Sequence, residues 1–316
     1  MFPVADGRAG GEAAGPRDIP DGQSFARFAD IDRPCDGALT RGVTPSAAGH
    51  LELIASTLRR SGVSHVIFDF DGTISWLRHG WPDLMLELFL ERAPAGTRLP
   101  EAFASEVRAD ILSLNGKPSI HQVLRFCERV REWGKTPPDP DELLREYQTR
   151  LARTVRDRVA ALERGELQAA DFLVAGAGEM IEKLLRRGLV LVILSGTVEE
   201  DVKREAELLG LTKFFGRHIY GSAPGTAFSK QDVIDRILRE EQIDGSGLLA
   251  FGDGPVEIEF TKNAGGLAIG VASDEAENGS HRIDADKREQ LIRAGADAII
   301  PDYAEADALL AAIFRA

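Results

Sequence analysis

Short apolar runs alternate with helix-like patterns along the second half of this chain, and this alternation restricts the possible fold more than any other feature. Each run beyond Gly176 is short enough to be a buried strand, and each is followed by a segment with helical spacing. The runs cover residues 189–194, 218–220, 248–251, 267–271 and 298–300, and one more, residues 63–70, lies far upstream. Strand–helix alternation of this kind predicts a mostly parallel sheet with helices on both faces.

The stretch between the first run and the others is predicted to be helical. Its candidate helices cover residues 82–92, 101–113, 119–133 and 141–162, separated by Pro and Gly signals. We therefore expect an α/β fold, a Rossmann-like doubly wound parallel sheet with an all-helical cap domain inserted after the first strand. The expected parts are a flexible N-terminal extension at 1–45, an α/β core at 46–75 and 176–316, and the cap at 76–175. An amphipathic helix is also expected from Pro45 to Arg60.

The overall charge is acidic, with a formal net charge of -13. Nucleic-acid backbones and anionic membranes favour basic surfaces, so neither is expected as a partner. The two cysteines, Cys35 and Cys127, are far apart and lack metal-ligand spacing, which favours a reduced, cytoplasmic setting. We expect neither a signal peptide nor a membrane span, because no apolar run has the required length.

Two carboxylates follow directly on the first apolar run, in the sequence Asp-Phe-Asp-Gly-Thr at residues 69–73. Side chains two positions apart on an extended segment point the same way, so Asp69 and Asp71 can face one reaction centre. Asp-Gly between apolar residues is also a strong turn signal, and a β-hairpin is the alternative at this point. The segment that would form the second strand soon becomes polar, at Arg78, which weighs against the hairpin.

Polar residues also follow the later runs, at the sheet edge where ligands bind in folds of this class. Ser195 and Thr197 follow the second run. Either hydroxyl can cap the next helix, and such a turn can also hold a phosphate oxygen. Lys230 lies in the first turn of a predicted helix, where a bound anion would relieve its conflict with the helix dipole. Lone lysines are more often solvated, and this remains the alternative.

Asp253 and Glu257 follow the buried run at residues 248–251. Carboxylates beside a buried strand are costly unless they are paired, hydrogen-bonded or bound to metal. Mg²⁺ favours hard oxygen ligands and takes one or two protein carboxylates together with phosphate, which suits Asp253 and Asp69. A simple Asp-Gly turn is the alternative.

Taken in order, these motifs resemble those of phosphatases of the haloacid dehalogenase superfamily. The first motif of that family, Asp-x-Asp-Gly-Thr, stands at 69–73, and its later motifs match Ser195, Lys230 and the Gly252-Asp253 segment. The insertion point of the helical block is similar to that of members with a helical, C1-type cap, such as phosphoglycolate phosphatases and beta-phosphoglucomutases. The resemblance covers residues 63–302, and Glu257 departs from it, since the family often has Asp there.

The resemblance implies a Mg²⁺-dependent phosphatase of a small phosphorylated metabolite, and a phosphorylated sugar or sugar acid is the first expectation. Asp69 would attack phosphorus to form an aspartyl-phosphate, and Asp71 would protonate the leaving alcohol and then activate water. The implied phosphate-binding residues are Thr73, Ser195, Gly196 and Lys230, and the implied metal ligands are Asp69, Asp71, Asp253 and Glu257.

Other reactions of the family leave alternatives open. Members that displace halide from carbon lack the second aspartate, so Asp71 favours phosphate chemistry. Phosphonate-cleaving members use a cap lysine, and Lys117 and Lys135 keep that option open. A sugar phosphomutase uses the same core and differs in how well its cap excludes water. A non-catalytic phosphate-binding module is disfavoured by the intact motif residues.

Substrate choice is expected to depend on the cap, because only the cap can close over the leaving group. The candidate substrate residues are Arg78 and His79, soon after the first motif, and Asn115 and Lys117, in a polar turn between cap helices. Ordinary loop and helix-capping roles are the alternative for all four.

Overall fold

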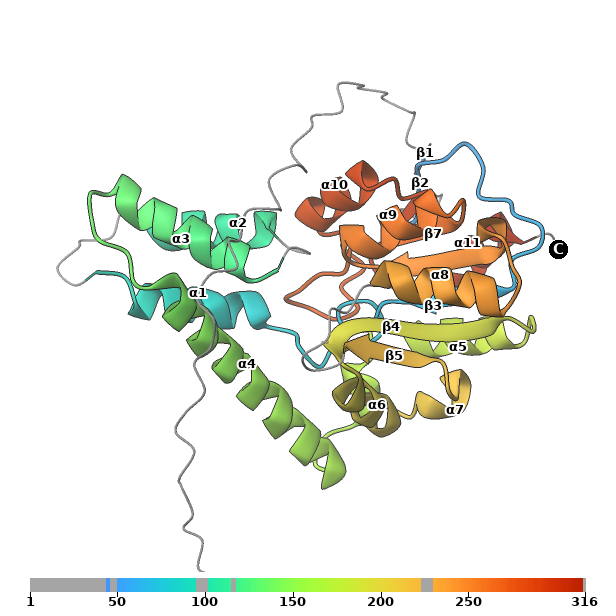
Figure 1. Cartoon of the computed structure of the whole chain (residues 1–316), viewed down its shortest axis with the longest axis horizontal. Helices are drawn as coiled ribbons and strands as arrows, with labels where there is room; N and C mark the ends of the chain where they lie inside the picture. The colour runs from blue at the N-terminus through green and yellow to red at the C-terminus, as the bar shows by residue number, and fades with distance from the viewer. Residues whose placement is uncertain (1–43, 46–49, 95–101, 115–117, 223–229, 315–316) are drawn as a thin grey trace, which may run out of the picture. The chain divides into compact units, whose positions relative to one another are not determined.

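An eight-stranded sheet forms the core in the computed structural model, which describes residues 44–45, 50–94, 102–114, 118–222 and 230–314 (Figure 1). Its strand order is β1-β2-β8-β7-β6-β3-β4-β5. The strands are β1 (Thr44–Pro45), β2 (Glu52–Leu53), β3 (His65–Phe68), β4 (Val190–Val198), β5 (Ile219–Ser222), β6 (Leu248–Gly252), β7 (Leu267–Val271) and β8 (Ala298–Ile300). Strands β3 to β8 pair in parallel, so the predicted mostly parallel sheet is confirmed.

Successive residues of a strand point to opposite faces of the sheet, and in the parallel strands the residues on both faces are apolar. Helices therefore cover both faces of the sheet. In β3, Val66 and Phe68 pack in one cluster with α5 and α11, whereas Ile67 packs in another with α8. The core helices are α5 (Ala177–Leu185), α6 (Glu199–Leu208), α7 (Thr212–Phe215), α8 (Lys230–Glu240), α9 (Pro255–Asn263), α10 (Ala285–Arg293) and α11 (Ala306–Ile313), with 3-10 turns at Ala169–Phe172 and Gly245–Gly247. The doubly wound arrangement is thus confirmed.

Two short antiparallel strands extend the sheet where a helix is predicted from the sequence. β2 pairs with β8, and β1 pairs with β2. The prediction of a helix at 45–60 is therefore wrong, although Leu51 and Leu58 are buried as it requires. The edge of β8 offers backbone hydrogen bonds, and Ser56 and Thr57 have weak helix propensity, so pairing with the sheet prevails. The expected N-terminal extension otherwise lies outside the described residues.

As predicted, helices make up the regular structure in the described part of the insertion after β3: α1 (Trp81–Glu91), α2 (Phe103–Ser113), α3 (Ile120–Glu132) and α4 (Pro140–Glu163). These helices form a core of their own, in which Phe89 stacks on Phe126 with ring centroids 4.4 Å apart. α4 begins after Asp139, whose side chain accepts a hydrogen bond from Glu142 N at 2.8 Å. Over the described parts of the chain, no helix is long and apolar enough to cross a membrane. The cap limits at 76 and 175 stay a prediction.

The outgoing and returning ends of this helical segment lie side by side in a short neck, residues 74–76 and 172–174. Trp76 N donates to Phe172 O at 2.8 Å, and Val174 N donates to Ile74 O at 3.0 Å. Ser75 also forms an antiparallel bridge with Leu173. The cap is therefore joined to the core through a paired, two-stranded connection.

Candidate active site

β3 carries two carboxylates to the carboxyl edge of the sheet. Backbone pairing continues one residue beyond the strand, since Asp69 N donates to Phe251 O at 2.9 Å. The Asp69 side chain is buried, Asp71 is half-buried, and the chain then turns at Gly72 with φ of 74°. Both neighbours of β3 are parallel strands, so the alternative of a β-hairpin at this Asp-Gly step is excluded. The carboxylates thus lie at the edge where such sheets bind ligands.

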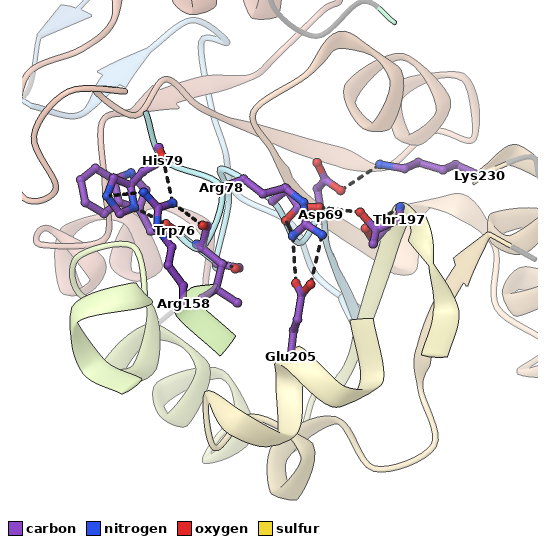
Figure 2. Close-up of polar contacts among 12 residues, drawn as sticks. Asp69, Trp76, Arg78, His79, Arg158, Thr197, Glu205 and Lys230 are labelled. Carbon is purple, nitrogen blue, oxygen red and sulfur yellow. Dashed lines mark hydrogen bonds and ion pairs between the residues drawn. The ribbon is translucent and has the colours of Figure 1, made fainter. Parts of the chain in front are cut away.

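Lys230, the first residue of α8, joins two of the predicted site carboxylates. Its Nζ lies 2.8 Å from Asp69 Oδ1 and also contacts Glu257 Oε1 in the first turn of α9. Figure 2 shows Lys230 pointing toward Asp69. Burial, followed by the charge of Glu257, raises the pKa of Asp69 well above its ordinary value, and Lys230 acts in the opposite direction. Burial lowers the pKa of Lys230, but the two carboxylates more than reverse that effect. The site therefore concentrates negative charge around an ammonium that is largely shielded from solvent.

Asp253, just after β6, lies directly against the turn that follows the first motif. A Cβ on Gly72 would meet Asp253 Oδ2 at 2.2 Å, so glycine is required for this approach. The buried Lys287 of α10 places its Nζ 3.1 Å from the same oxygen and donates to Ser273 Oγ at 3.0 Å. Ser273 in turn donates to Gly72 O at 3.0 Å. These contacts fix Asp253 beside the backbone of Gly72.

Asp71 is held by a hydroxyl and a guanidinium. Thr197 donates from Oγ1 to Asp71 Oδ2 at 3.0 Å, and Arg78 Nη1 lies 2.5 Å from Oδ1. The same guanidinium donates two hydrogen bonds, of 2.8 and 3.1 Å, to Glu205 of α6 (Figure 2). Burial raises the pKa of Glu205 above its ordinary value, although Arg78 acts against the shift. The two motif carboxylates thus have different partners: Asp69 an ammonium, Asp71 a hydroxyl and a guanidinium.

The remaining predicted phosphate-binding residues lie on β4 and in the turn after β3. Ser195 is buried and its Oγ accepts a hydrogen bond from Thr197 N at 3.0 Å, whereas Gly196 is exposed. Thr73 is fully buried, and its hydroxyl has no hydrogen-bond partner in the described part of the chain. The prediction that Ser195 or Thr197 caps the next helix is wrong. β4 continues to Val198, which precedes α6 without a side-chain cap.

His79 lies in a cluster that supports the neck. Its ring stacks on Trp76 with centroids 4.1 Å apart, and its Nδ1 lies 2.8 Å from Trp76 O. Arg158 of α4 donates from Nη1 to the carbonyl oxygens of Leu77 and His79, at 2.5 and 2.9 Å. Figure 2 shows His79, Trp76 and Arg158 in one group and Asp69 with Lys230 in another. Burial lowers the pKa of His79, which favours the neutral ring.

The four candidate substrate residues therefore have different outcomes. Arg78 contacts Asp71 and lies at the site. His79 packs in the neck. Asn115 and Lys117 fall outside the described residues.

Two charged residues near the site are not predicted by the sequence motifs. Glu205 is buried on the same side of α6 as Val202, and Lys287 is buried on the same side of α10 as Leu291. Charged residues are rarely buried without a partner, so a charge at an apolar position of a helical pattern is the signal that reveals them. Both positions have that pattern in the sequence.

The carboxylates supply hard oxygen donors without a preformed metal cage. Within the described residues, no group of three or more His, Cys, Asp and Glu side chains is arranged to hold a metal ion. Asp69 and Glu257 instead share Lys230, and Asp253 pairs with Lys287. Mg²⁺ takes only one or two protein carboxylates and completes its shell with water and phosphate oxygens. The excess of negative charge and the type of donor therefore fit Mg²⁺.

Residues 63–265 match the family model of haloacid dehalogenase-like hydrolases. The match begins just before β3 and includes both motif aspartates, Lys230 and Asp253. Among proteins with curated descriptions, none matches this chain in sequence.

Several solved structures share the fold. A conserved haloacid dehalogenase-like protein of unknown function from Agrobacterium tumefaciens has a TM-score of 0.58 and 18% identity, covering 79% of this chain and 99% of that one. A HAD family hydrolase from Deinococcus radiodurans with bound phosphate and sodium has a TM-score of 0.54 and 19% identity, covering 80% and 97%. A predicted phosphoglycolate phosphatase from Haemophilus somnus has a TM-score of 0.51 and 14% identity, covering 79% and 98%. At these identities the likeness is one of fold.

Proposed function

The chain belongs to the haloacid dehalogenase-like hydrolase family, and from this premise we propose that it is a Mg²⁺-dependent phosphatase of a small phosphate monoester. The observation that carries the proposal is the pair of motif carboxylates with different partners. Asp69 faces the Lys230 ammonium, whereas Asp71 faces the Thr197 hydroxyl and the Arg78 guanidinium. Hydrolysis through a covalent intermediate needs one carboxylate as nucleophile and another that exchanges protons. The phosphate bound by the Deinococcus radiodurans hydrolase supports the same ligand chemistry.

In the proposed reaction, Asp69 attacks phosphorus and forms an acyl phosphate while the bond from phosphorus to the leaving oxygen breaks. Asp71 gives its proton to that oxygen and so releases an alcohol. Asp71 then takes a proton from the water that attacks phosphorus, the bond from phosphorus to the Asp69 oxygen breaks, and inorganic phosphate leaves. Both side chains return to their starting protonation states. Thr197 and Arg78 hold Asp71 in one orientation through both proton transfers.

The phosphoryl oxygens need donors that are in place before the reaction begins. Lys230 is fixed by two carboxylates, and we assign it to one phosphoryl oxygen. Ser195 and Gly196 at the end of β4, with Thr73, are the further proposed donors. Asp69, Asp253, Glu257 and the backbone carbonyl of Asp71 would hold Mg²⁺, and its charge would offset that of the phosphoryl group.

Phosphate release from a panel of sugar phosphates, phosphoglycolate and nucleotides, with Mg²⁺ and with EDTA, tests the proposal. We expect release that requires the metal and is confined to one or a few members. No release from any member would contradict the proposal. Isomerisation of a sugar phosphate in the presence of a bisphosphate primer, without net release, would instead identify a phosphomutase.

A further inference from the structure

A cavity of about 400 Å³ lies between cap helix α4 and core helix α6. Leu151 and Val155 give its cap wall an apolar character, and Arg78 and Glu205 line it on the core side. Arg78 also contacts Asp71, the proposed proton donor to the leaving oxygen. The group attached to the phosphate therefore begins beside Arg78, and the cavity is large enough to receive a small metabolite.

The positive charge of Arg78 is already compensated where it faces this cavity. Glu205 accepts two hydrogen bonds from the guanidinium, and Asp71 accepts a third. Glu205 is 4% exposed and Arg78 is largely shielded, so the pair interacts across a medium of low dielectric constant. On the rim, Arg204 pairs with Glu163 at 2.6 Å. Arg156 and Asp201, which also line the cavity and are exposed, carry opposite charges and make no ion pair with any residue that the structure describes. An anionic group entering the cavity would find no unpaired cation beside Asp71 among the described residues.

We propose that Glu205 is a specificity-determining residue that makes this cavity select an uncharged leaving group, such as a polyol or a neutral sugar. A leaving group with a carboxylate or a second phosphate near the ester is rejected, because Glu205 repels it and occupies the guanidinium that would bind it. Hydroxyl groups remain suitable partners, since they donate to Glu205 and accept from Arg78. The apolar wall on α4 suits the carbon skeleton. The inference rests on the proposed function and narrows its substrate class.

The burial of Glu205 supports a selective role over a purely structural one. A carboxylate on the buried side of α6 is costly, and a buried ion pair adds little stability relative to apolar residues of the same volume. Binding sites gain specificity by repelling unwanted ligands as well as by attracting the right one, and the ion pair of Glu205 and Arg78 fits such a role.

Two pairs of phosphate esters that differ only in CH₂OH against carboxylate test the inference. They are sn-glycerol 1-phosphate with 3-phospho-D-glycerate, which share the configuration at C2, and sorbitol 6-phosphate with 6-phosphogluconate. We expect the wild type to prefer the neutral member of a pair by roughly tenfold in kcat/KM. Glu205→Gln should lower that preference by about tenfold, because it removes the repulsion and leaves the shape. The ratio within a pair is the readout, since a general loss of activity cancels in it.

Two further variants separate specificity from folding. Arg78→Gln leaves Glu205 uncompensated and should raise the preference for the neutral ester, the opposite of Glu205→Gln. Glu207→Gln removes the same charge from an exposed position of α6 and should leave the ratio unchanged. A wild type that prefers the acids, or a ratio unmoved in both site variants, overturns the inference while the phosphatase stands. Absence of Mg²⁺-dependent release from all four esters and from 4-nitrophenyl phosphate contradicts the proposed function itself.

Discussion

Replacing Asp69 with Asn removes one charge and the proposed nucleophile while leaving the shape of the side chain almost unchanged. An amide cannot form the acyl phosphate, so phosphate release should fall by roughly 10⁴-fold or more. The effect on folding has the opposite sign. Burial and the neighbouring carboxylate raise the pKa of Asp69, so its ionised form destabilises the folded state at neutral pH. A neutral amide, which can still accept a hydrogen bond from Lys230, relieves that cost.

The size of the expected change in stability depends on whether the metal is present. In EDTA the variant should gain about 1 kcal/mol of unfolding free energy, which for a domain of this size raises the melting temperature by about 2–4 °C. In Mg²⁺ at 100 times its dissociation constant, the wild type should gain about 2.7 kcal/mol, whereas the variant lacks a ligand and gains less. The two proteins should therefore exchange their order of melting temperature between EDTA and Mg²⁺.

Thermal melts followed by circular dichroism, with phosphate release on the same samples, measure both effects. Asp83→Asn is the control, because Asp83 is an exposed cap residue paired with Arg108 and should change neither quantity appreciably. Substantial turnover by Asp69→Asn would refute the covalent mechanism. A variant that melts several degrees below the wild type in EDTA would refute the argument that the ionised Asp69 opposes folding.

Three further results are expected. Lys230→Met leaves two buried carboxylates without their shared cation and should cost about 3–5 kcal/mol in urea denaturation with EDTA; a cost below about 1 kcal/mol would contradict the pairing. Because the raised pKa of Asp69 lets protons compete with the metal, Mg²⁺ affinity measured by calorimetry should fall as the pH is lowered from about 8 to about 6, and constant affinity would exclude this competition. Gly72→Ala and Gly80→Ala share a positive φ, of 74° and 78°, which should cost each variant about 1 kcal/mol of unfolding free energy. Only Gly72→Ala also places a Cβ against Asp253, so it should lose more stability and bind Mg²⁺ more weakly than Gly80→Ala. Equal Mg²⁺ affinity in these two variants would show that the close approach is unimportant.

The parallel sheet and the cap helices could be predicted because their signals are local. Buried parallel strands are continuous apolar runs, and β6 (Leu248–Gly252) and β7 (Leu267–Val271) are buried along their whole length. The helix expected at 45–60 failed because Leu51, Leu53 and Leu58 fit a helical face, while pairing with β8 depends on residues far along the chain. The paired neck likewise joins segments separated by the whole cap and carries no local pattern.

The motif residues of the site could also be predicted, since their order along the chain mirrors the order of strand ends. Asp69, Lys230 and Glu257 were expected at one centre and do meet there. Their particular partners could not be predicted, because the contacts of Glu205 and Lys287 depend on how α6 and α10 dock on the sheet. Helical periodicity places these two charges on buried faces but does not say what they face.

The paired neck also has a consequence for the entropy of the unfolded chain. Its backbone hydrogen bonds bring Ile74 next to Val174 and so close a loop that contains the entire cap. The entropy lost on closing a loop grows only with the logarithm of its length, and each doubling adds about 0.6 kcal/mol. The entropic cost of closing the loop at the neck would therefore be nearly the same for a cap of half or twice this size. A core closed at such a neck can accept caps of very different length, provided that each one folds around an apolar centre of its own.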